Sequence, residues 1–204
     1  RKFILEINGR NIFAKGGNWV PNDAYLPRVS KEKIDRLVED AEEAGYNMLR
    51  VWGGGIYEDS HFFEACDRAG IMVLMDFPFA CNFYPEDEEI LSSIRTEAEQ
   101  NLRRLRHHPS LVLLSGNNEC YPCHFVWNKL KESDRFFGRR IYEEVLPEIC
   151  RDLAPEIPYV RGSPYSPDKP DDPDGEASGD RHAWQLGFGI SKEKNYRHMT
   201  QEKG

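Results

Sequence analysis

The stretch from His107 to Glu119, HHPSLVLLSGNNE, decides the fold class of this chain. Pro109 cannot continue a helix, so it marks a helix end. The four apolar residues at 111–114 are typical of a strand buried on both faces, as in a parallel sheet covered by helices. Polar residues follow at once and end in Asn118 and Glu119. Because α/β folds bind ligands at the carboxyl ends of parallel strands, Glu119 is the first candidate for chemistry.

Glu119 also has a plainer interpretation. A loop glutamate at this place could cap the next helix or face water, and the sequence alone leaves that alternative open. Its position directly after a buried strand, beside the amides of Asn117 and Asn118, favours the functional interpretation.

The rest of the chain alternates apolar strands with amphipathic helices, which predicts parallel βαβ units. A hairpin is expected over residues 3–14, because Asn8-Gly9 suits a type I′ turn. Ser30 is the expected N-cap of the first helix, and Gly45 and Gly70 are expected to close the first two helices. Helical spacing predicts helices over 31–44, 60–69, 88–106 and 134–153. Apolar runs predict strands over 46–52, 71–75, 111–114, 157–161 and 179–184.

Polar and aromatic residues stand at the ends of nearly all predicted strands. Catalytic groups from many strand ends are typical of a (β/α)8 barrel, whereas a nucleotide-binding sheet would need a glycine-rich phosphate loop that this chain lacks. Trp and Tyr pack on sugar rings, and Asn, Asp and Arg hydrogen-bond hydroxyl groups, so the pattern predicts a carbohydrate-binding barrel. The residues concerned are Asn18, Trp19, Arg50, Trp52, Asp76, Asn118, Glu119, Ser163, His182 and Trp184.

Charge and composition disfavour several classes of protein. The net charge of −8 over 204 residues disfavours nucleic acids and anionic membrane surfaces as partners. No apolar run approaches the roughly 20 residues that a membrane span needs. The odd number of cysteines, five, and the absence of a signal peptide favour reduced thiols and the cytoplasm, although the sequence leaves the compartment undetermined.

No metal and no cofactor are expected. Cys120 and Cys123 form a C-x-x-C motif beside His124, but no second pair at zinc-ligand spacing follows. The acidic loop over 164–179 misses the spacing of a calcium loop and is interrupted by prolines. A metal-dependent barrel hydrolase would also need a His-x-His pair at the first strand end, and none is present.

Several motifs in register carry a family resemblance. They are residues 15–21 (KGGNWVP), 47–57 (NMLRVWGGGIY), 76–81 (DFPFAC), 108–110 with 116–119 (HPS and GNNE) and 179–184 (GDRHAW). Together they resemble the catalytic domain of glycoside hydrolase family 2, and within it the β-mannosidase branch. The implied fold is an α/β (β/α)8 TIM barrel that is incomplete, with about six of its eight β/α units. Residues 1–204 would form this partial catalytic domain, with 1–14 as a hairpin leading into the barrel and 188–204 as a polar tail.

The resemblance implies retaining hydrolysis of terminal β-mannosides. Glu119 would be the acid/base, which protonates the leaving oxygen and later deprotonates the incoming water. Asn118 would bond the 2-hydroxyl of the sugar, and Arg50 would position the nucleophilic carboxylate. The expected residues of the sugar pocket are Trp19, Trp52, Asp76, Trp127, His182 and Trp184. The implied partner is a carbohydrate substrate, and the oligomeric state is undetermined.

The chain lacks the nucleophile that this family pattern requires. That glutamate ends the seventh barrel strand in a Ser-Glu-Phe-Gly-like setting, and neither Glu193 nor Glu202 follows an apolar strand. The chain is therefore expected to stop short of that strand and to be inactive by itself. Two alternatives stay open, namely another family 2 exo-glycosidase such as an exo-β-glucosaminidase, and a non-catalytic carbohydrate-binding barrel.

Overall fold

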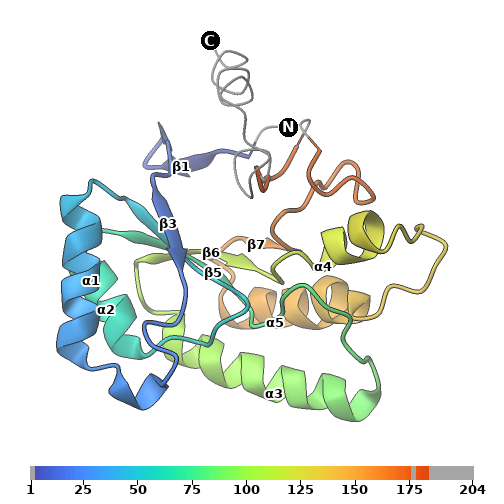
Figure 1. The fold of residues 1–204 in the computed structure, drawn as a ribbon, viewed down its shortest axis with the longest axis horizontal. Helices are drawn as coiled ribbons and strands as arrows, with labels where there is room; N and C mark the ends of the chain where they lie inside the picture. Colours follow the sequence, from blue (N-terminus) through green and yellow to red (C-terminus); the bar gives the residue numbers. More distant parts are fainter. Residues whose placement is uncertain (1–2, 176–177, 184–204) are drawn as a thin grey trace.

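The central sheet of the molecule is parallel throughout. The computed structural model describes residues 3–175 and 178–183. In this part of the chain, the sheet has five strands in sequential order, each paired in parallel with the next (Figure 1). The strands are β3 (Gly16–Trp19), β4 (Met48–Val51), β5 (Met72–Asp76), β6 (Leu111–Ser115) and β7 (Tyr159–Val160).

A helix lies between each strand and the next. The four connecting helices are α1 (Lys31–Glu43), α2 (Ser60–Ala69), α3 (Glu88–Leu105) and α5 (Leu146–Leu153). The shorter helical elements are η1 (Leu26–Arg28), α4 (Cys120–Pro122), η2 (Cys123–Trp127) and η3 (Ile141–Val145). The predicted βαβ pattern is therefore confirmed over five strands.

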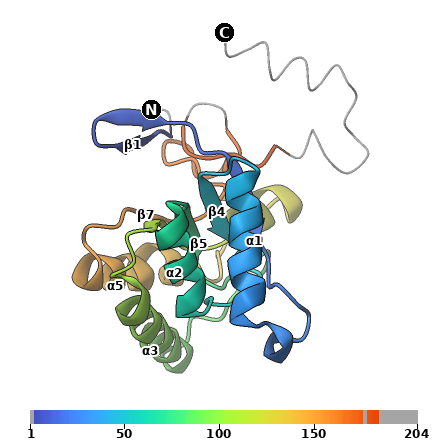
Figure 2. The same cartoon turned by 90° about the vertical axis from the view of Figure 1, so that its left-hand side faces the viewer.

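The two faces of the sheet are covered differently. The connecting helices gather on one face, where their apolar side chains join those of the strands in the main core (Figures 1 and 2). On the other face a smaller cluster packs against the hairpin of β1 (Leu5–Ile7) and β2 (Arg10–Ile12). The buried members of that cluster are Met48, Met72, Leu74 and Leu113. Because both faces are covered, the central strands β5 and β6 are apolar until their last residues, without a polar alternation.

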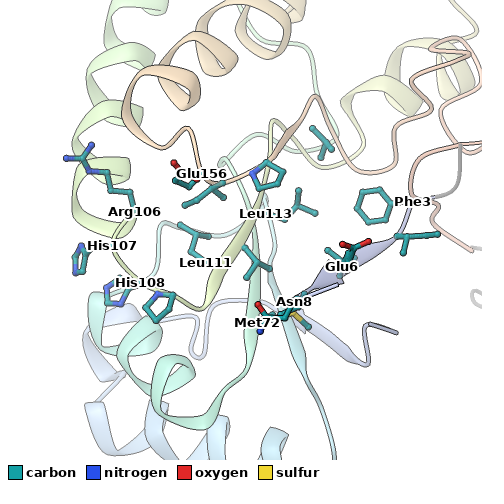
Figure 3. Close-up of a pocket in the computed structure, with 18 residues that line it drawn as sticks. Phe3, Glu6, Asn8, Met72, Arg106, His107, His108, Leu111, Leu113 and Glu156 are labelled. Carbon is teal, nitrogen blue, oxygen red and sulfur yellow. The ribbon is translucent and has the colours of Figure 1, made fainter. Parts of the chain in front are cut away.

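A cavity of about 870 Å³ lies between the hairpin and this second face. Figure 3 shows its lining, which includes Phe3 from the segment before β1, Met72 and Leu111 from the strands, and His107 from the end of α3. None of the predicted site residues is among the residues that line this cavity. Met72 and Leu111 begin their strands, so the cavity reaches the amino ends of β5 and β6.

Several local sequence signals are confirmed. The Ser30 hydroxyl accepts a hydrogen bond from the backbone N–H of Lys33, as an N-cap does. Gly70 ends α2 in the left-handed conformation, with φ of 67°. Asn8 and Gly9 have φ of 51° and 74°, as the type I′ turn of the hairpin requires.

Two predicted elements differ from the structure. The helix expected over 134–153 begins only at Ile141, because Gly138 has a φ of 94° that no α-helix allows. The strand expected over 179–184 is not formed by 179–183, and Trp184 lies outside the described residues. An unpredicted helical segment, α4 with η2, directly follows Glu119. Among the described residues, no helix has both the length and the apolar character needed to cross a membrane.

We expect Gly16→Ala to destabilise the protein by about 3 kcal/mol, because overpacking forces the backbone to shift. A Cβ at Gly16 would lie 1.6 Å from the carbonyl oxygen of Met48 on the neighbouring strand. Gly17→Ala is the control, since its Cβ would make an ordinary 3.6 Å contact with the Tyr46 ring. Urea denaturation of both variants measures the difference, and equal losses of stability would contradict the close approach of β3 and β4.

Candidate active site

The backbone after β6 is held from both sides. Asn118 bridges to Ala80, beyond β5, and to Ser163, beyond β7. The Glu119 N–H donates to the Ser163 carbonyl at 2.9 Å, and the Asn118 N–H donates to the Phe79 carbonyl at 2.8 Å. The sheet pairing therefore extends past the formal strand ends to the candidate residues.

Glu119 has a left-handed backbone, with φ of 58°. For a residue with a side chain this conformation costs about 1–2 kcal/mol, so the surrounding hydrogen bonds must offset the cost. Glu119 stands at the N-cap position of α4, but its side chain makes no capping hydrogen bond. The Asn117 side chain instead accepts from the backbone N–H of Cys120 at 2.9 Å. Glu119 is therefore not the helix-capping residue of this turn.

The Glu119 carboxylate is buried, with 5% of the residue exposed. Its Oε1 lies 2.6 Å from Nδ1 of His182. Its Oε2 accepts from Nδ2 of Asn118 and from Sγ of Cys81, each at 3.4 Å. Glu119 thus faces protein polar groups, and the plainer alternative of a water-facing glutamate does not fit the structure.

Arg50 joins three strands of the site through one guanidinium group. Its Nη2 donates to Oδ2 of Asp76 at 2.6 Å and to Oδ1 of Asn118 at 2.9 Å. The same Asp76 oxygen accepts the backbone N–H of Gly53 at 3.0 Å. Burial raises the pKa of the Asp76 carboxyl, and the charge and hydrogen bond of Arg50 oppose that rise. Arg50, Asp76, Asn118 and Glu119 therefore form one connected group.

His182 belongs to the same group, although it comes from the last described segment. Its Nε2 lies 3.0 Å from the Ser163 hydroxyl, which in turn donates to Oδ2 of Asp180. Its backbone N–H donates to Oδ1 of Asp174 at 2.7 Å. The imidazole is thus held between Glu119 on one side and Ser163 on the other.

The structure describes three of the four predicted tryptophans, and they differ in their surroundings. Trp19 is 8% exposed and packs on Phe62 of α2, with ring centroids 4.6 Å apart, so it is a core residue. The Trp52 ring lies over Gly54, where an added Cβ would approach it to 2.0 Å. Trp127 ends η2 and is 49% exposed. Trp184 lies outside the described residues, so its predicted role stays a prediction.

Sequence reasoning missed three residues of the candidate group, Cys81, Asp174 and Asp180. Ser163 was among the polar residues predicted at strand ends, and the structure places its hydroxyl 3.0 Å from Nε2 of His182. Cys81 and Asp180 lie inside the quoted motifs, so their position gave a signal. Asp174 lies in the acidic loop, where nothing in the pattern distinguishes it from its neighbours.

The site shows no arrangement for a metal within the described part of the chain. There, no three His, Cys, Asp or Glu side chains gather in a way that could hold an ion. All five cysteines are free, and four of them are buried. The C-x-x-C pair of Cys120 and Cys123 therefore forms no disulfide.

Comparisons with known proteins place this geometry in context. No model of a known protein family matches the chain. The β-mannosidase B of Thermothelomyces thermophilus is 40% identical over 211 residues, which is 98% of this chain and 23% of that protein. The β-mannosidase B of Emericella nidulans is 40% identical over 214 residues, covering 100% of this chain and 24% of that protein. The chain thus spans about a quarter of the length of these curated relatives.

Comparison with solved structures also finds a β-mannosidase. The β-D-mannosidase from Dictyoglomus thermophilum superposes with a TM-score of 0.89 and 45% identity, over 96% of this chain and 24% of that one. The exo-chitosanase CsxA from Amycolatopsis orientalis superposes with a TM-score of 0.62 over 78% of this chain and 18% of that one. Its identity is 19%, so this second likeness shows the fold alone.

Two observations relate the chain to the glycoside hydrolases. One is the buried Asn118-Glu119 pair at the carboxyl edge of a parallel sheet, and the other is the similarity in sequence and structure to β-mannosidases. Within that class it is a homologue of the β-mannosidases of glycoside hydrolase family 2, and it corresponds to part of a domain of those proteins. The family resemblance carried by the sequence motifs is confirmed.

We expect Asp76→Asn to lower the free energy of unfolding by about 3 kcal/mol, because it breaks a buried ion pair from one side. The Asp76 side chain is fully buried and that of Arg50 is 14% exposed. Glu148→Gln is the matched control, since the exposed pair of Glu148 and Arg95 has a similar distance of 2.8 Å. The control should lose less than about 1 kcal/mol. Denaturant titration measures the free energy of unfolding of both variants. A loss of stability in Asp76→Asn no greater than in Glu148→Gln would refute the argument that burial makes the Asp76–Arg50 ion pair important for stability.

We expect the Cys81 thiol to react slowly with a disulfide reagent, although Cys81 is exposed. Partial loss of hydration, followed by the hydrogen bond and negative charge of Glu119, raises the pKa of the Cys81 thiol to about 11. Since the thiolate is the reactive form, the labelling rate should rise about tenfold per pH unit from pH 7 to pH 10. Glu119→Gln removes the negative charge, so labelling should be faster at each pH.

Cys81→Ser serves as the control for the labelling experiment and should abolish the accessible signal, because the four other cysteines are buried. A rate that levels off near pH 8.5 in the unsubstituted protein, where an unperturbed thiol titrates, would contradict the contact between Cys81 and Glu119.

Proposed function

We propose that this chain forms part of the active site of a retaining β-mannosidase, with Glu119 as its acid/base. The observation that carries the proposal is the buried Asn118-Glu119 pair at the carboxyl edge of a parallel sheet. The 40% identity to curated β-mannosidases supports mannose as the sugar. The activity of the whole protein is part of the proposal, since the chain spans about a quarter of those relatives.

Glu119 would transfer a proton twice in each turnover. In the first step its carboxyl group gives a proton to the leaving oxygen while a nucleophile takes the sugar. In the second step its carboxylate takes a proton from the water that releases the sugar. The fixed backbone of residues 117–119 supports this role, because the carboxyl group must keep its position through both steps.

The surrounding residues would orient the substrate and the nucleophile. Arg50 binds Oδ1 of Asn118 and so fixes the orientation of the amide, whose Nδ2 donates to Sγ of Cys81 at 3.2 Å and to Oε2 of Glu119 at 3.4 Å. Donation from Nδ2 to the 2-hydroxyl of the sugar would replace one of these two contacts. Asp76 fixes Arg50, and Arg50 would hold the nucleophilic carboxylate. Trp52, Trp127 and Trp184 remain proposed pocket residues, whereas Trp19 packs in the core.

We also propose that the sheet is part of a (β/α)8 barrel. Sequential parallel strands with the connecting helices on one face are typical of that fold, whereas a doubly wound sheet carries helices on both faces. A retaining enzyme needs a second carboxylate about 5–5.5 Å from the first. In this proposal the nucleophile follows a seventh strand that is not among residues 1–204, so this chain would be inactive by itself.

The decisive test compares two lengths of the protein with p-nitrophenyl β-mannoside. The 204-residue chain should not hydrolyse it, whereas a version extended to the length of the relatives should do so with retention of configuration. In the extended version, Glu119→Gln should reduce turnover about 10²–10⁴-fold, and Glu148→Gln on the exposed face of α5 should have no effect. Turnover by the 204-residue chain that disappears in Glu119→Gln would place the nucleophile within this chain.

The extended protein also separates the two alternative functions. A preference for β-glucosaminides over β-mannosides would favour another family 2 exo-glycosidase on the same fold. Mannose binding without turnover by the extended protein, measured by calorimetry, would favour a non-catalytic carbohydrate-binding barrel.

A further inference from the structure

We propose that His182 is a positioning residue that shares a single proton with Glu119, rather than a residue that primarily contacts the sugar. The inference rests on the proposed acid/base role of Glu119. Its starting point is the 2.6 Å distance between Nδ1 of His182 and Oε1 of Glu119, which is short for a hydrogen bond to nitrogen.

The hydrogen bond at the other ring nitrogen, Nε2, determines which nitrogen of His182 shares a proton with Glu119. Asp180 is an acceptor, because its Oδ1 accepts the backbone N–H of Tyr165 at 2.9 Å and its Oδ2 accepts the Ser163 hydroxyl hydrogen. A hydroxyl has one hydrogen to donate, so Ser163 can only accept from Nε2 of His182. Nε2 therefore carries a hydrogen, and Nδ1 is the nitrogen that gains or loses one.

The hydrogen bonds of the Glu119 carboxyl group complete the assignment of the shared proton. Oε2 accepts from the Asn118 amide and from the Cys81 thiol, so the carboxyl proton belongs on Oε1, opposite Nδ1. Two states then differ by the position of one proton: a carboxylic acid beside a neutral imidazole, and a carboxylate beside an imidazolium. The proton is held next to Glu119 in either state and is available to the leaving oxygen.

The charged groups around His182 are consistent with this sharing. Nη1 of Arg50 lies 3.5 Å from Nε2, which is too long to compete with the 3.0 Å bond to Ser163. Asp76 neutralises Arg50 through its 2.6 Å ion pair. The Asp174 carboxylate accepts the backbone N–H of His182, and the Asp180 carboxylate accepts the Ser163 hydroxyl that faces Nε2. In the imidazolium state, the negative charges of Asp174 and Asp180 therefore offset the repulsion between His182 and the guanidinium of Arg50.

The test measures the ring nitrogens of His182 directly, in the 204-residue chain labelled with ¹⁵N-histidine. We expect Nε2 to resonate as a protonated nitrogen at pH 7, and the bond to Glu119 to give a proton resonance shifted far downfield. His182→Asn assigns both signals among the six histidines of the chain. Glu119→Gln should abolish the downfield resonance, and Ser163→Ala should leave Nε2 without its fixed hydrogen, giving mixed tautomers.

The chain contains a matched control. Nδ1 of His108 lies 2.6 Å from Oδ2 of Asp67, the same distance as in the His182 pair. Its Nε2 is buried without a hydrogen-bond partner among the described residues, so it lacks an anchor like Ser163. Glu119→Gln and Ser163→Ala should therefore leave the His108 signals unchanged. A change at both histidines would indicate a general disturbance of the fold and would count against the proposal.

Two further outcomes would overturn the inference. One is an unprotonated Nε2 of His182 in the unsubstituted chain, identified by the signals that His182→Asn removes. The other is a His182 signal that Glu119→Gln does not alter. Neither depends on turnover, so a protein that shares this proton but fails to cleave β-mannosides would refute the proposed function and leave the proton assignment standing.

Discussion

The position of the candidate site depends on the hydrogen bonds that hold residues 117–119 between two neighbouring segments. Asn118 exchanges backbone bonds with Phe79 and Cys81 on one side, and Ser163 exchanges them with Asn117 and Glu119 on the other. These bonds stabilise the left-handed backbone of Glu119, which would otherwise be unfavourable. They also bring Cys81 and Ser163 against the carboxylate and its partner, so one constraint on the backbone places the acid, its donors and its imidazole neighbour together.

A second constraint is the shared guanidinium of Arg50. One nitrogen, Nη2, is bonded at 2.6 Å to Asp76 and at 2.9 Å to Asn118, so side chains from β4 and from the ends of β5 and β6 cannot move independently. The ion pair with Asp76 also limits the positive charge felt by His182, whose Nε2 lies 3.5 Å from Nη1. The fully buried carboxylate of Asp76 is thus tolerated because the partly buried guanidinium of Arg50 compensates its charge.

Sequence patterns predicted the strongly periodic helices and strands. They also placed Glu119 shortly after β6, because a short apolar run flanked by helix signals has few interpretations other than a buried strand. They could not predict that His182 contacts Glu119, since the two are 63 positions apart and no local rule relates them. Trp19 illustrates a different difficulty. Its place at a strand end was predicted, but side chains alternate along a strand, and only the register decides that Trp19 packs on Phe62 in the helix-covered core.

The geometry of Arg50 also indicates where a second carboxylate would bind. Nη2 already makes two short bonds, whereas the contacts of Nη1 within residues 3–175 and 178–183 are the 3.5 Å ones with Asn18 and His182. Nε is buried without a partner among the residues that the structure describes. The Nη1 group of Arg50 therefore retains the capacity to donate to a further acceptor beside the Glu119 cluster. In the proposed enzyme, a nucleophilic carboxylate at that edge would complete the pair that a retaining glycosidase requires, and Arg50 would then link the proposed proton donor, Glu119, to the proposed nucleophile.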